Sequence, residues 1–351
     1  MGGMARYPIT RLKADGFGPL DMVDIEFSPG LNIVTGDNAT GKSQLLKLLY
    51  AGSRTLHRSQ TPTKSGLASR VAEALVGVFR PDQLGRLTRR GQGRTRTTVE
   101  LTYQGMAPLD FSFASNARTD VNIRSFPNSK LDDIPVFLPS RELLSLYPGL
   151  VALFDSREVE FDETWRDTAL LLGRAALKGR RGTHARTLLA PLFEEIEGSV
   201  VEENGRFYVQ LPTGGTGAGR IEAHLVSEGF RKLAMIIRLV TNGVLLDGGY
   251  LFWDEPEANL NPRTQQSVAK AIVTMADTGT QVFVATHSVF LLRELELLLE
   301  GSPTKARYIG LYRRACDDTA VRAESATDPA DLSVIAALKA ESAQSLRYLA
   351  A

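Results

Sequence analysis

The alternation of apolar and polar residues along the chain predicts a mixed α/β protein. Residues 9–14 and 22–27 alternate as two half-buried strands do, and Gly16 and Gly18 between them favour a turn. Four later runs are almost wholly apolar, as strands are when helices cover both faces of a sheet. These runs are 31–35, 134–139, 250–253 and 281–285. We therefore expect an antiparallel lead-in followed by a buried sheet.

Helical spacing marks the segments between these runs. Residues 65–79 place Leu67, Val71 and Leu75 on one side of a helix. The other expected elements are strands at about 97–103 and 109–114, a helix starting at Leu143, helices over 150–198 with a turn at 178–182, a hairpin of 199–203 and 206–211, and a helix over 233–240. The helices within 143–198 predict a helical lobe inserted in the sheet domain.

Composition narrows the class of protein. Lys and Arg number 41 against 40 Asp and Glu, so the net charge of +1 creates no global field for nucleic acid or a membrane. The single cysteine, Cys316, excludes an internal disulfide and a multi-cysteine zinc site. The sequence has no signal peptide and no apolar run of about 18 residues. We expect a cytoplasmic protein that does not use a membrane.

The strongest chemical signal lies at residues 36–43, which match the phosphate-loop pattern G-x-x-x-x-G-K-[ST] in full between a predicted strand and a predicted helix. The loop consists of Gly36, Asp37, Asn38, Ala39, Thr40, Gly41, Lys42 and Ser43. Its glycines let backbone N–H groups face phosphates, and the helix N-terminus adds partial positive charge. Lys42 is expected to reach the β- and γ-phosphates, and the Ser43 hydroxyl to bind Mg²⁺. The loop therefore predicts ATP and Mg²⁺ as ligands.

Two other buried runs end in polar residues suited to the same chemistry. Asp254 and Glu255 follow the run at 250–253, and His287 follows the run at 281–285. Asp254 can hold Mg²⁺ directly or through water, while Glu255 can polarise an attacking water as general base. A neutral imidazole at a strand end can donate to a γ-phosphate, and open α/β sheets bind ligands at that edge. We therefore predict catalytic roles for Glu255, His287 and Lys42.

The order of these segments resembles the ABC-type ATPase head. Ser227-Glu228-Gly229 precedes the helix of 233–240, and Asn259-Leu260-Asn261-Pro262 follows the two carboxylates. In the ABC family two heads dimerise head to tail, and the signature serine and glycine of one subunit close over the γ-phosphate held by the other. The resemblance implies that Ser227 and Gly229 act in this way, that Asn259 belongs to the D-loop, and that His287 is the switch histidine.

Three longer segments look like the bacterial "AAA family ATPase" group of ABC-type ATPases. They are 138–142, 226–233 and 253–260. This group is similar to the ATPase head of overcoming-lysogenisation-defect nucleases, and its members often occur in antiphage or toxin–antitoxin loci beside an effector. The resemblance implies an ABC-type head, with a P-loop mixed or parallel sheet, an antiparallel β lobe and a helical lobe. We expect this domain to span 1–320, with its helical insertion at about 143–198, and a C-terminal helical tail to span 321–351.

Two departures from the transporter pattern bear on the reaction. Glu228 stands where transporters have glycine, and Phe230 stands where they have glutamine. No glutamine follows the strand of 134–139, so Glu142 or Ser140 is the candidate for its place near Mg²⁺. These departures favour slow hydrolysis.

Functions of different class remain open. The first is an ATP-hydrolysing dimer, or higher oligomer, that controls a nuclease or toxin effector, with antiphage defence as its setting. The second is a nucleotide-gated scaffold or antitoxin that restrains a toxin and hydrolyses slowly or not at all. A third is a DNA recombination-repair ATPase. The motifs are the same in all three, so the sequence does not separate them.

Two groups of basic residues are candidates for contact with DNA phosphates. The first group is Arg86, Arg89, Arg90, Arg94 and Arg96, and the second contains Arg180 and Arg181. A charge run of this kind is also typical of a solvated loop.

Overall fold

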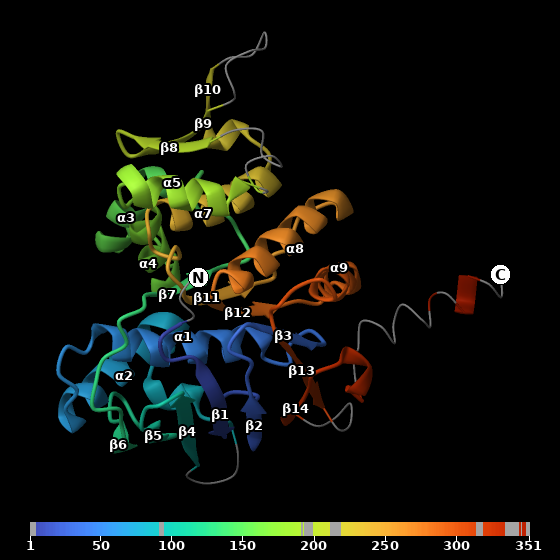
Figure 1. The fold of residues 1–351 in the computed structure, drawn as a ribbon. Coiled ribbons are helices and arrows are strands. Elements are labelled where there is room, and N and C mark those ends of the chain that lie inside the picture. Colours follow the sequence, from blue (N-terminus) through green and yellow to red (C-terminus); the bar gives the residue numbers. More distant parts are fainter. Residues whose placement is uncertain are drawn as a thin grey trace.

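The computed structural model describes residues 5–90, 95–190, 192, 199–210, 219–313, 319–333, 344 and 346–348. Within these residues the chain forms three β-sheets and two groups of helices (Figure 1). The central sheet has six strands in the order β14-β13-β3-β12-β11-β7. Its strands are β3 Leu31–Gly36, β7 Pro135–Leu138, β11 Gly249–Asp254, β12 Thr280–Ala285, β13 Ala306–Arg313 and β14 Val321–Ala326. All neighbours are parallel except β13 and β14.

Two antiparallel sheets lie on either side of this sheet. The larger has the order β2-β1-β4-β5-β6 and the smaller the order β10-β9-β8. The larger sheet comprises β1 Ile9–Asp15, β2 Val23–Glu26, β4 Arg96–Tyr103, β5 Leu109–Ala114 and β6 Asn122–Ser125. The smaller comprises β8 Ser199–Glu203, β9 Arg206–Gln210 and β10 Arg220–Glu222. Asn204 and Gly205 both have positive φ, as the tight turn between β8 and β9 requires.

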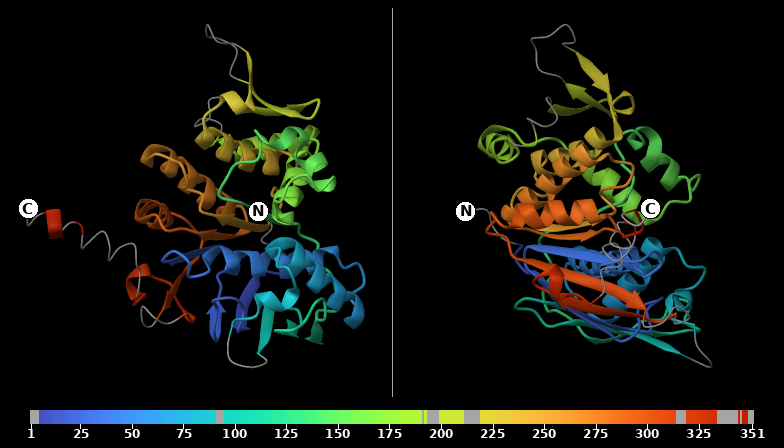
Figure 2. Two further views of the ribbon diagram at one scale, coloured as in Figure 1. Left: turned by 180° about the vertical axis from the view of Figure 1, so that it is seen from behind. Right: turned by 90° about the vertical axis from the view of Figure 1, so that its right-hand side faces the viewer.

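The helices fill the layers between the sheets. α1 lies between the five-stranded and six-stranded sheets, and α7, α8 and α9 lie on the other side of the central sheet (Figures 1 and 2). The helices are α1 Lys42–Arg58, α2 Lys64–Phe79, α3 Tyr147–Asp155, α4 Glu163–Leu172, α5 Gly179–Leu188, α7 Glu228–Thr241, α8 Pro262–Asp277 and α9 Val289–Leu299, with short 3-10 turns η1 Leu84–Leu87, η2 Ala223–Leu225 and η3 Pro329–Asp331. No helix of the described residues is long and apolar enough to cross a membrane.

The side chains of β11 explain why residues 250–253 of this strand are all apolar. Tyr250 and Phe252 point into the core shared with α1 and the five-stranded sheet, whereas Leu251 and Trp253 point into the core shared with α7 and α8. All four side chains are fully buried. Because successive residues of a strand face opposite sides, a sheet covered on both sides needs apolar residues at every position. The apolar runs thus predicted four strands of this sheet correctly, namely β3, β7, β11 and β12.

The helical lobe differs from the prediction at its start and at its turn. Leu143 and Leu144 are buried but not helical, and α3 begins only at Tyr147. The carboxylate of Glu142 accepts hydrogen bonds from the backbone N–H and the hydroxyl of Ser145, and this local turn competes with a helix. The turn expected at 178–182 is also wrong, because Gly179 to Gly182 form the first turn of α5.

Four strands were not predicted: β6, β10, β13 and β14. β14 lies within the segment expected to be a helical tail, yet it pairs with β13 from Val321↔Arg313 to Ala326↔Tyr308 and so extends the central sheet. Leu332 packs on the core beyond it. The remainder of the expected tail, at 334–343, 345 and 349–351, lies outside the described residues, as do 191 and 193–198 of the expected helical block.

Candidate functional site

The phosphate loop joins β3 to α1. Gly41 has φ 90°, and a Cβ there would meet the Pro19 ring at 2.8 Å, so both backbone conformation and space require glycine. A Cβ at Gly36 would lie 2.5 Å from the carbonyl oxygen of Leu311. Ala39 is also left-handed, with φ 61°, and its carbonyl accepts a hydrogen bond of 2.7 Å from the Arg313 guanidinium at the end of β13. Strand β13 and the segment around Pro19 therefore hold the loop closely.

Lys42 lies over the loop that it follows. Its ammonium donates to the carbonyl oxygens of Gly36 at 2.8 Å and Asp37 at 3.1 Å. Thr40 is buried and donates to the same Asp37 carbonyl, whereas Asp37 and Asn38 are exposed. Burial lowers the pKa of Lys42, and nearby carboxylates, Glu255 first among them, oppose this shift. The side chain thus stands at the head of the loop among groups that favour its charged form.

Ser43 and Asp254 meet beside Lys42. The Ser43 hydroxyl donates to Oδ1 of Asp254 at 3.0 Å, although the two residues are far apart in sequence. Burial raises the pKa of Asp254 to about 6. A hydroxyl and a carboxylate with little other hydrogen bonding suit Mg²⁺, which takes few protein ligands and completes its shell with water and phosphate oxygens. These two side chains are the pair that would hold the metal.

A cavity of about 380 Å³ opens over Ser43 and the neighbouring Lys42. Its lining residues are Pro19, Asn38, Ala39, Gly41, Lys42, Ser43, Gln44 and Glu255. Backbone N–H groups at the N-terminus of α1 and the Lys42 ammonium make its floor suitable for an anion.

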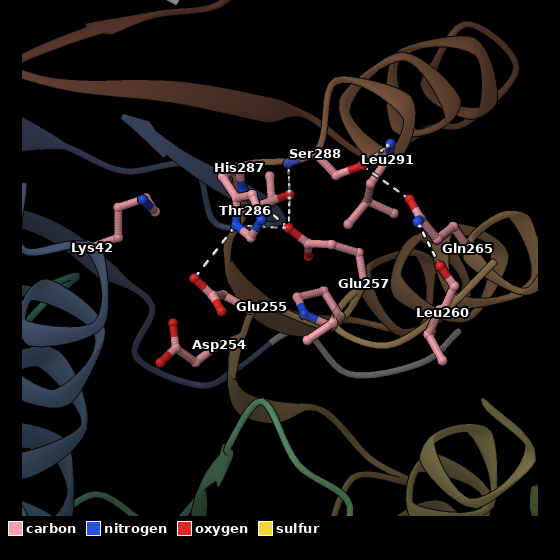
Figure 3. A network of polar contacts seen from close by, with 12 residues as sticks. Lys42, Asp254, Glu255, Glu257, Leu260, Gln265, Thr286, His287, Ser288 and Leu291 are labelled. Carbon is pink, nitrogen blue, oxygen red and sulfur yellow. Dashed lines mark hydrogen bonds and ion pairs between the residues drawn. The ribbon is translucent and has the colours of Figure 1, made fainter. Parts of the chain in front are cut away.

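Glu255 and His287 lie at the ends of β11 and β12, beside the cavity. Nδ1 of His287 is 3.4 Å from Oε1 of Glu255 and 3.5 Å from Oε1 of Glu257 (Figure 3). Glu255 has φ 45°, a left-handed conformation uncommon for a residue other than glycine, and its N–H donates to the carbonyl oxygen of Ala285. Backbone strain of this kind tends to occur at functional sites, where surrounding contacts hold it.

Glu257 is a residue of this site to which the sequence assigned no role. Its side chain is only 4% exposed, and its Oε1 accepts hydrogen bonds from the Thr286 hydroxyl at 2.6 Å and the His287 N–H at 3.0 Å. The feature of the sequence that could have pointed to Glu257 is a third acidic residue soon after the buried run of residues 250–253. That signal is weak, because most acidic residues in such loops are solvated.

The signature segment lies away from the phosphate loop of its own chain. Ser227 is the residue before the first turn of α7, and its exposed side chain makes no capping hydrogen bond. No hydrogen bond or ion pair in the described part of the chain joins Ser227 or Gly229 to residues 36–43. Gly229 packs against Thr264 and Leu260. Asn259 is left-handed, with φ 62°, and donates to the Glu228 carboxylate at 3.3 Å. The N-terminus of α7 and the segment after Glu257 therefore form one surface.

The carboxylate of Glu142 is held by α7. Arg231 Nε lies 2.8 Å from its Oε1, and Ser145 takes the remaining hydrogen bonds. The side chain is buried, and no hydrogen bond or ion pair among the described residues joins Glu142 or Ser140 to Ser43 or Asp254. The structure thus pairs this carboxylate with Arg231 instead of the metal ligands.

The arginines considered for DNA do not form one free cluster. Arg89 pairs with Asp21 at 3.1 Å, and Arg96 donates to the Ser112 hydroxyl at 3.0 Å. Arg181 forms an ion pair with Asp247. Arg86, Arg90 and Arg180 are exposed, and Arg94 lies outside the described residues. Contact with DNA stays a prediction.

Comparisons with solved structures support the fold. The chain is similar to an Smc head bound to the C-winged helix domain of ScpA, with 14% identity and a TM-score of 0.58 over 93% of this chain and 100% of that one. It is also similar to the SMC head domain from Thermotoga maritima, with 12% identity and a TM-score of 0.50 over 91% and 99%. A third match is an Smc head with an extended coiled coil bound to the C-terminal domain of ScpA derived from Pyrococcus furiosus, with 13% identity and a TM-score of 0.51 over 91% and 96%.

At these identities the likeness concerns the fold, and it confirms the predicted ABC-type ATPase head with its mixed sheet, antiparallel lobe and helical lobe. No curated protein matches the sequence. The family described as "AAA domain, putative AbiEii toxin, Type IV TA system" matches residues 31–293, which include the phosphate loop, both carboxylates and His287. Because this match covers most of the chain, the protein belongs to that family of AAA domains.

Proposed function

We propose that this protein is a Mg²⁺-dependent ATPase that dimerises head to tail on ATP and controls or restrains a partner effector. The observation that carries the proposal is the register of three parallel strands. Asp254 pairs with Ala285, and Ala285 pairs with Val34, so β11, β12 and β3 end at one edge of the sheet. The phosphate loop, the proposed metal ligand Asp254, the proposed base Glu255 and His287 all lie at these strand ends. Open α/β sheets bind their ligands at this edge.

Each side chain has a distinct part in the proposed reaction. Lys42 and the N–H groups of the loop bind the phosphates, and Lys42 stabilises charge on the transferred group. Glu255 accepts the proton of the attacking water, and His287 donates to the γ-phosphate from the adjacent strand. When bound by Ser43 and Asp254, Mg²⁺ would neutralise charge on the phosphate oxygens.

Dimerisation is supported by the surface next to the signature. Ser227 is exposed and does not contact the phosphate loop of its own chain, and Leu225 two residues earlier is 67% exposed. A large apolar side chain at a polar helix N-terminus suits an interface that closes over a ligand. We infer that this surface covers the nucleotide of a second copy.

The effector is proposed from the family. Its description names a putative toxin and a Type IV toxin–antitoxin system. Control of a toxin or nuclease, in an antiphage setting, is therefore the proposed role of the ATP-driven dimer. A non-hydrolysing scaffold is the alternative, and the observation that favours it is the capture of the Glu142 carboxylate by Arg231, away from the metal ligands.

A single-turnover assay tests hydrolysis and separates the candidates. Excess protein is mixed with Mg²⁺-ATP, and phosphate release is followed with and without double-stranded DNA. We expect release that is lost in Lys42→Ala and kept in the matched variant Lys64→Ala, because Lys64 is exposed at the start of α2. Strong stimulation by DNA without a partner would favour a recombination-repair ATPase. Release no faster than in Lys42→Ala would overturn the ATPase and leave the scaffold.

A further inference from the structure

The buried carboxylate of Glu257 lies where the segment after β11 meets residues 286–288, which follow β12. Glu257 is 4% exposed in its side chain, and one of its oxygens accepts hydrogen bonds from both Thr286 and the backbone of His287. The same oxygen lies 3.5 Å from Nδ1 of His287. Figure 3 shows Glu257 pointing at this loop from the side opposite Glu255. Glu257 thus accepts a hydrogen bond from the backbone of His287, and the ring of His287 lies between the carboxylates of Glu255 and Glu257.

A buried lysine lies near the buried carboxylate and bonds to the backbone on either side of it. Lys232 of α7 is fully buried, and its ammonium donates to the carbonyl oxygens of Pro256 at 3.2 Å and Ala258 at 2.7 Å. These are the residues on either side of Glu257. A buried ionised group is costly unless it is paired and hydrogen-bonded. The lysine therefore fixes the backbone from which the Glu257 side chain extends and supplies the opposite charge nearby.

The histidine loop is held from its other side as well. The Ser288 N–H donates to the Thr286 hydroxyl at 3.0 Å, and the Ser288 hydroxyl donates to Gln265 at 2.9 Å. Gln265 in turn donates to the carbonyl oxygen of Leu260 at 3.0 Å (Figure 3). Thr286 is both donor to Glu257 and acceptor from Ser288, so removal of Glu257 breaks the chain at its centre. Charge-assisted hydrogen bonds of this kind are stronger than neutral ones.

We propose that Glu257 is a positioning residue for hydrolysis, whose buried carboxylate holds the loop of residues 286–288 so that the His287 ring stays beside Glu255. The inference rests on the proposed ATPase function. Glu257 does not line the phosphate cavity, so it acts through His287 and not on the substrate. Glutamine at this position keeps the shape and one acceptor oxygen but loses the charge, which makes it the informative substitution.

A double-mutant cycle on ATP hydrolysis tests the proposal. The variants are Glu257→Gln, His287→Ala and the two combined, measured with the full chain and Mg²⁺-ATP. Glu257→Gln should lower kcat by roughly 10- to 100-fold with KM nearly unchanged, because supporting contacts of a catalytic group have effects of this size. In the His287→Ala background the same change should lower kcat by no more than about two-fold, since non-additivity marks residues that act together.

A matched variant controls for loss of a carboxylate. Glu294 of α9 accepts a hydrogen bond from Gln266 at 3.1 Å and is outside the network, so Glu294→Gln should leave kcat unchanged. If Glu257→Gln fails to fold, Thr286→Val serves instead, because it removes the shorter hydrogen bond to the same Glu257 oxygen. Thr286→Val should lower kcat when His287 is present and leave it nearly unchanged in the His287→Ala background.

The outcomes are distinguishable. The positioning role would be overturned if Glu257→Gln lowered kcat by the same factor with and without His287. It would also be overturned if Glu257→Gln kept the wild-type kcat. Either result would leave the ATPase intact. Absence of hydrolysis by the wild-type protein would remove the ATPase and the positioning role together.

Discussion

Replacement of Gly229 by alanine tests the contact between the signature helix and the segment after Glu257. An alanine Cβ would come within 3.0 Å of the Thr264 methyl carbon and lie 3.4 Å from Cδ2 of Leu260. Unbonded carbons prefer about 3.5–4.0 Å, so the helices must separate or Thr264 must rotate. Rotation would move the Thr264 hydroxyl from Asn261, whose side chain lies 3.2 Å away and caps α8.

Two opposing contributions determine how much Gly229→Ala changes the free energy of unfolding. Overpacking of this kind costs about 1–3 kcal/mol, whereas alanine stabilises a helix relative to glycine by at most about 1 kcal/mol, and by less at Gly229 because it lies in the first turn of α7. The free energy of unfolding of Gly229→Ala should therefore fall by about 0–3 kcal/mol. In a Thr264→Ser background the methyl group is absent and the hydroxyl remains. The steric cost is then removed, and only the helix preference of alanine over glycine affects the free energy of unfolding. There the same substitution should raise the free energy of unfolding, by up to about 1 kcal/mol.

Urea unfolding of the nucleotide-free protein measures both changes. Trp253, one of two tryptophans, is fully buried in β11 and serves as the fluorescence probe. The expected result is a change of sign between the two backgrounds. An equal effect of Gly229→Ala with threonine and with serine at position 264 would show that the close approach of α7 to α8 is wrong.

Three other predictions concern nucleotide and metal binding. Lys42→Ala should weaken Mg²⁺-ATP binding by about 10- to 100-fold, the value of a charged hydrogen bond, in calorimetric titration. Because burial raises the pKa of Asp254 to about 6, its carboxyl is protonated below that pH, and Mg²⁺ must displace the proton. The apparent Mg²⁺ affinity should thus fall about tenfold per pH unit below about 6 and level off above it; a flat profile in Mg²⁺ titrations would contradict this. Arg313→Met removes the 2.7 Å hydrogen bond to the left-handed Ala39 and should weaken Mg²⁺-ATP binding by about 2- to 10-fold, and unchanged affinity would exclude its support of the loop.

The sheet and the strand ends were predictable because their signal is local. The runs that became β3, β11 and β12 are almost wholly apolar, with Asn32 and Gln281 as buried exceptions, and polar residues lie at or just after their C-terminal ends. Parallel strands that share a sheet must present those ends at one edge, so the approach of Ser43 to Asp254 follows from topology alone.

The edge of the sheet was not predictable in the same way. Only Val321 of β14 is fully buried, and the remaining positions are half-buried. An edge strand gains its hydrogen bonds from the backbone, so its side chains need not follow a pattern. β13 contains Gly310 among its central residues, and glycine weakens a strand signal.

The support of His287 depends on contacts between distant residues. Lys232 breaks the apolar spacing of α7, and nothing local shows that its ammonium reaches the carbonyls of Pro256 and Ala258. Glu257 resembles any acidic loop residue until β12 is placed beside β11. Interactions of this kind require the folded chain.

The proposed ATP-driven dimer should be visible in the solution mass of the Glu255→Gln protein. This variant keeps the binding contacts and removes the base, so the bound state should accumulate. Light scattering should give the mass of one chain without nucleotide and of two chains with Mg²⁺-ATP, while the Lys42→Ala, Glu255→Gln double variant should stay at one. A mass unchanged by saturating Mg²⁺-ATP would rule out the ATP-driven dimer, and an assembly that is complete without nucleotide would point to the constitutive scaffold.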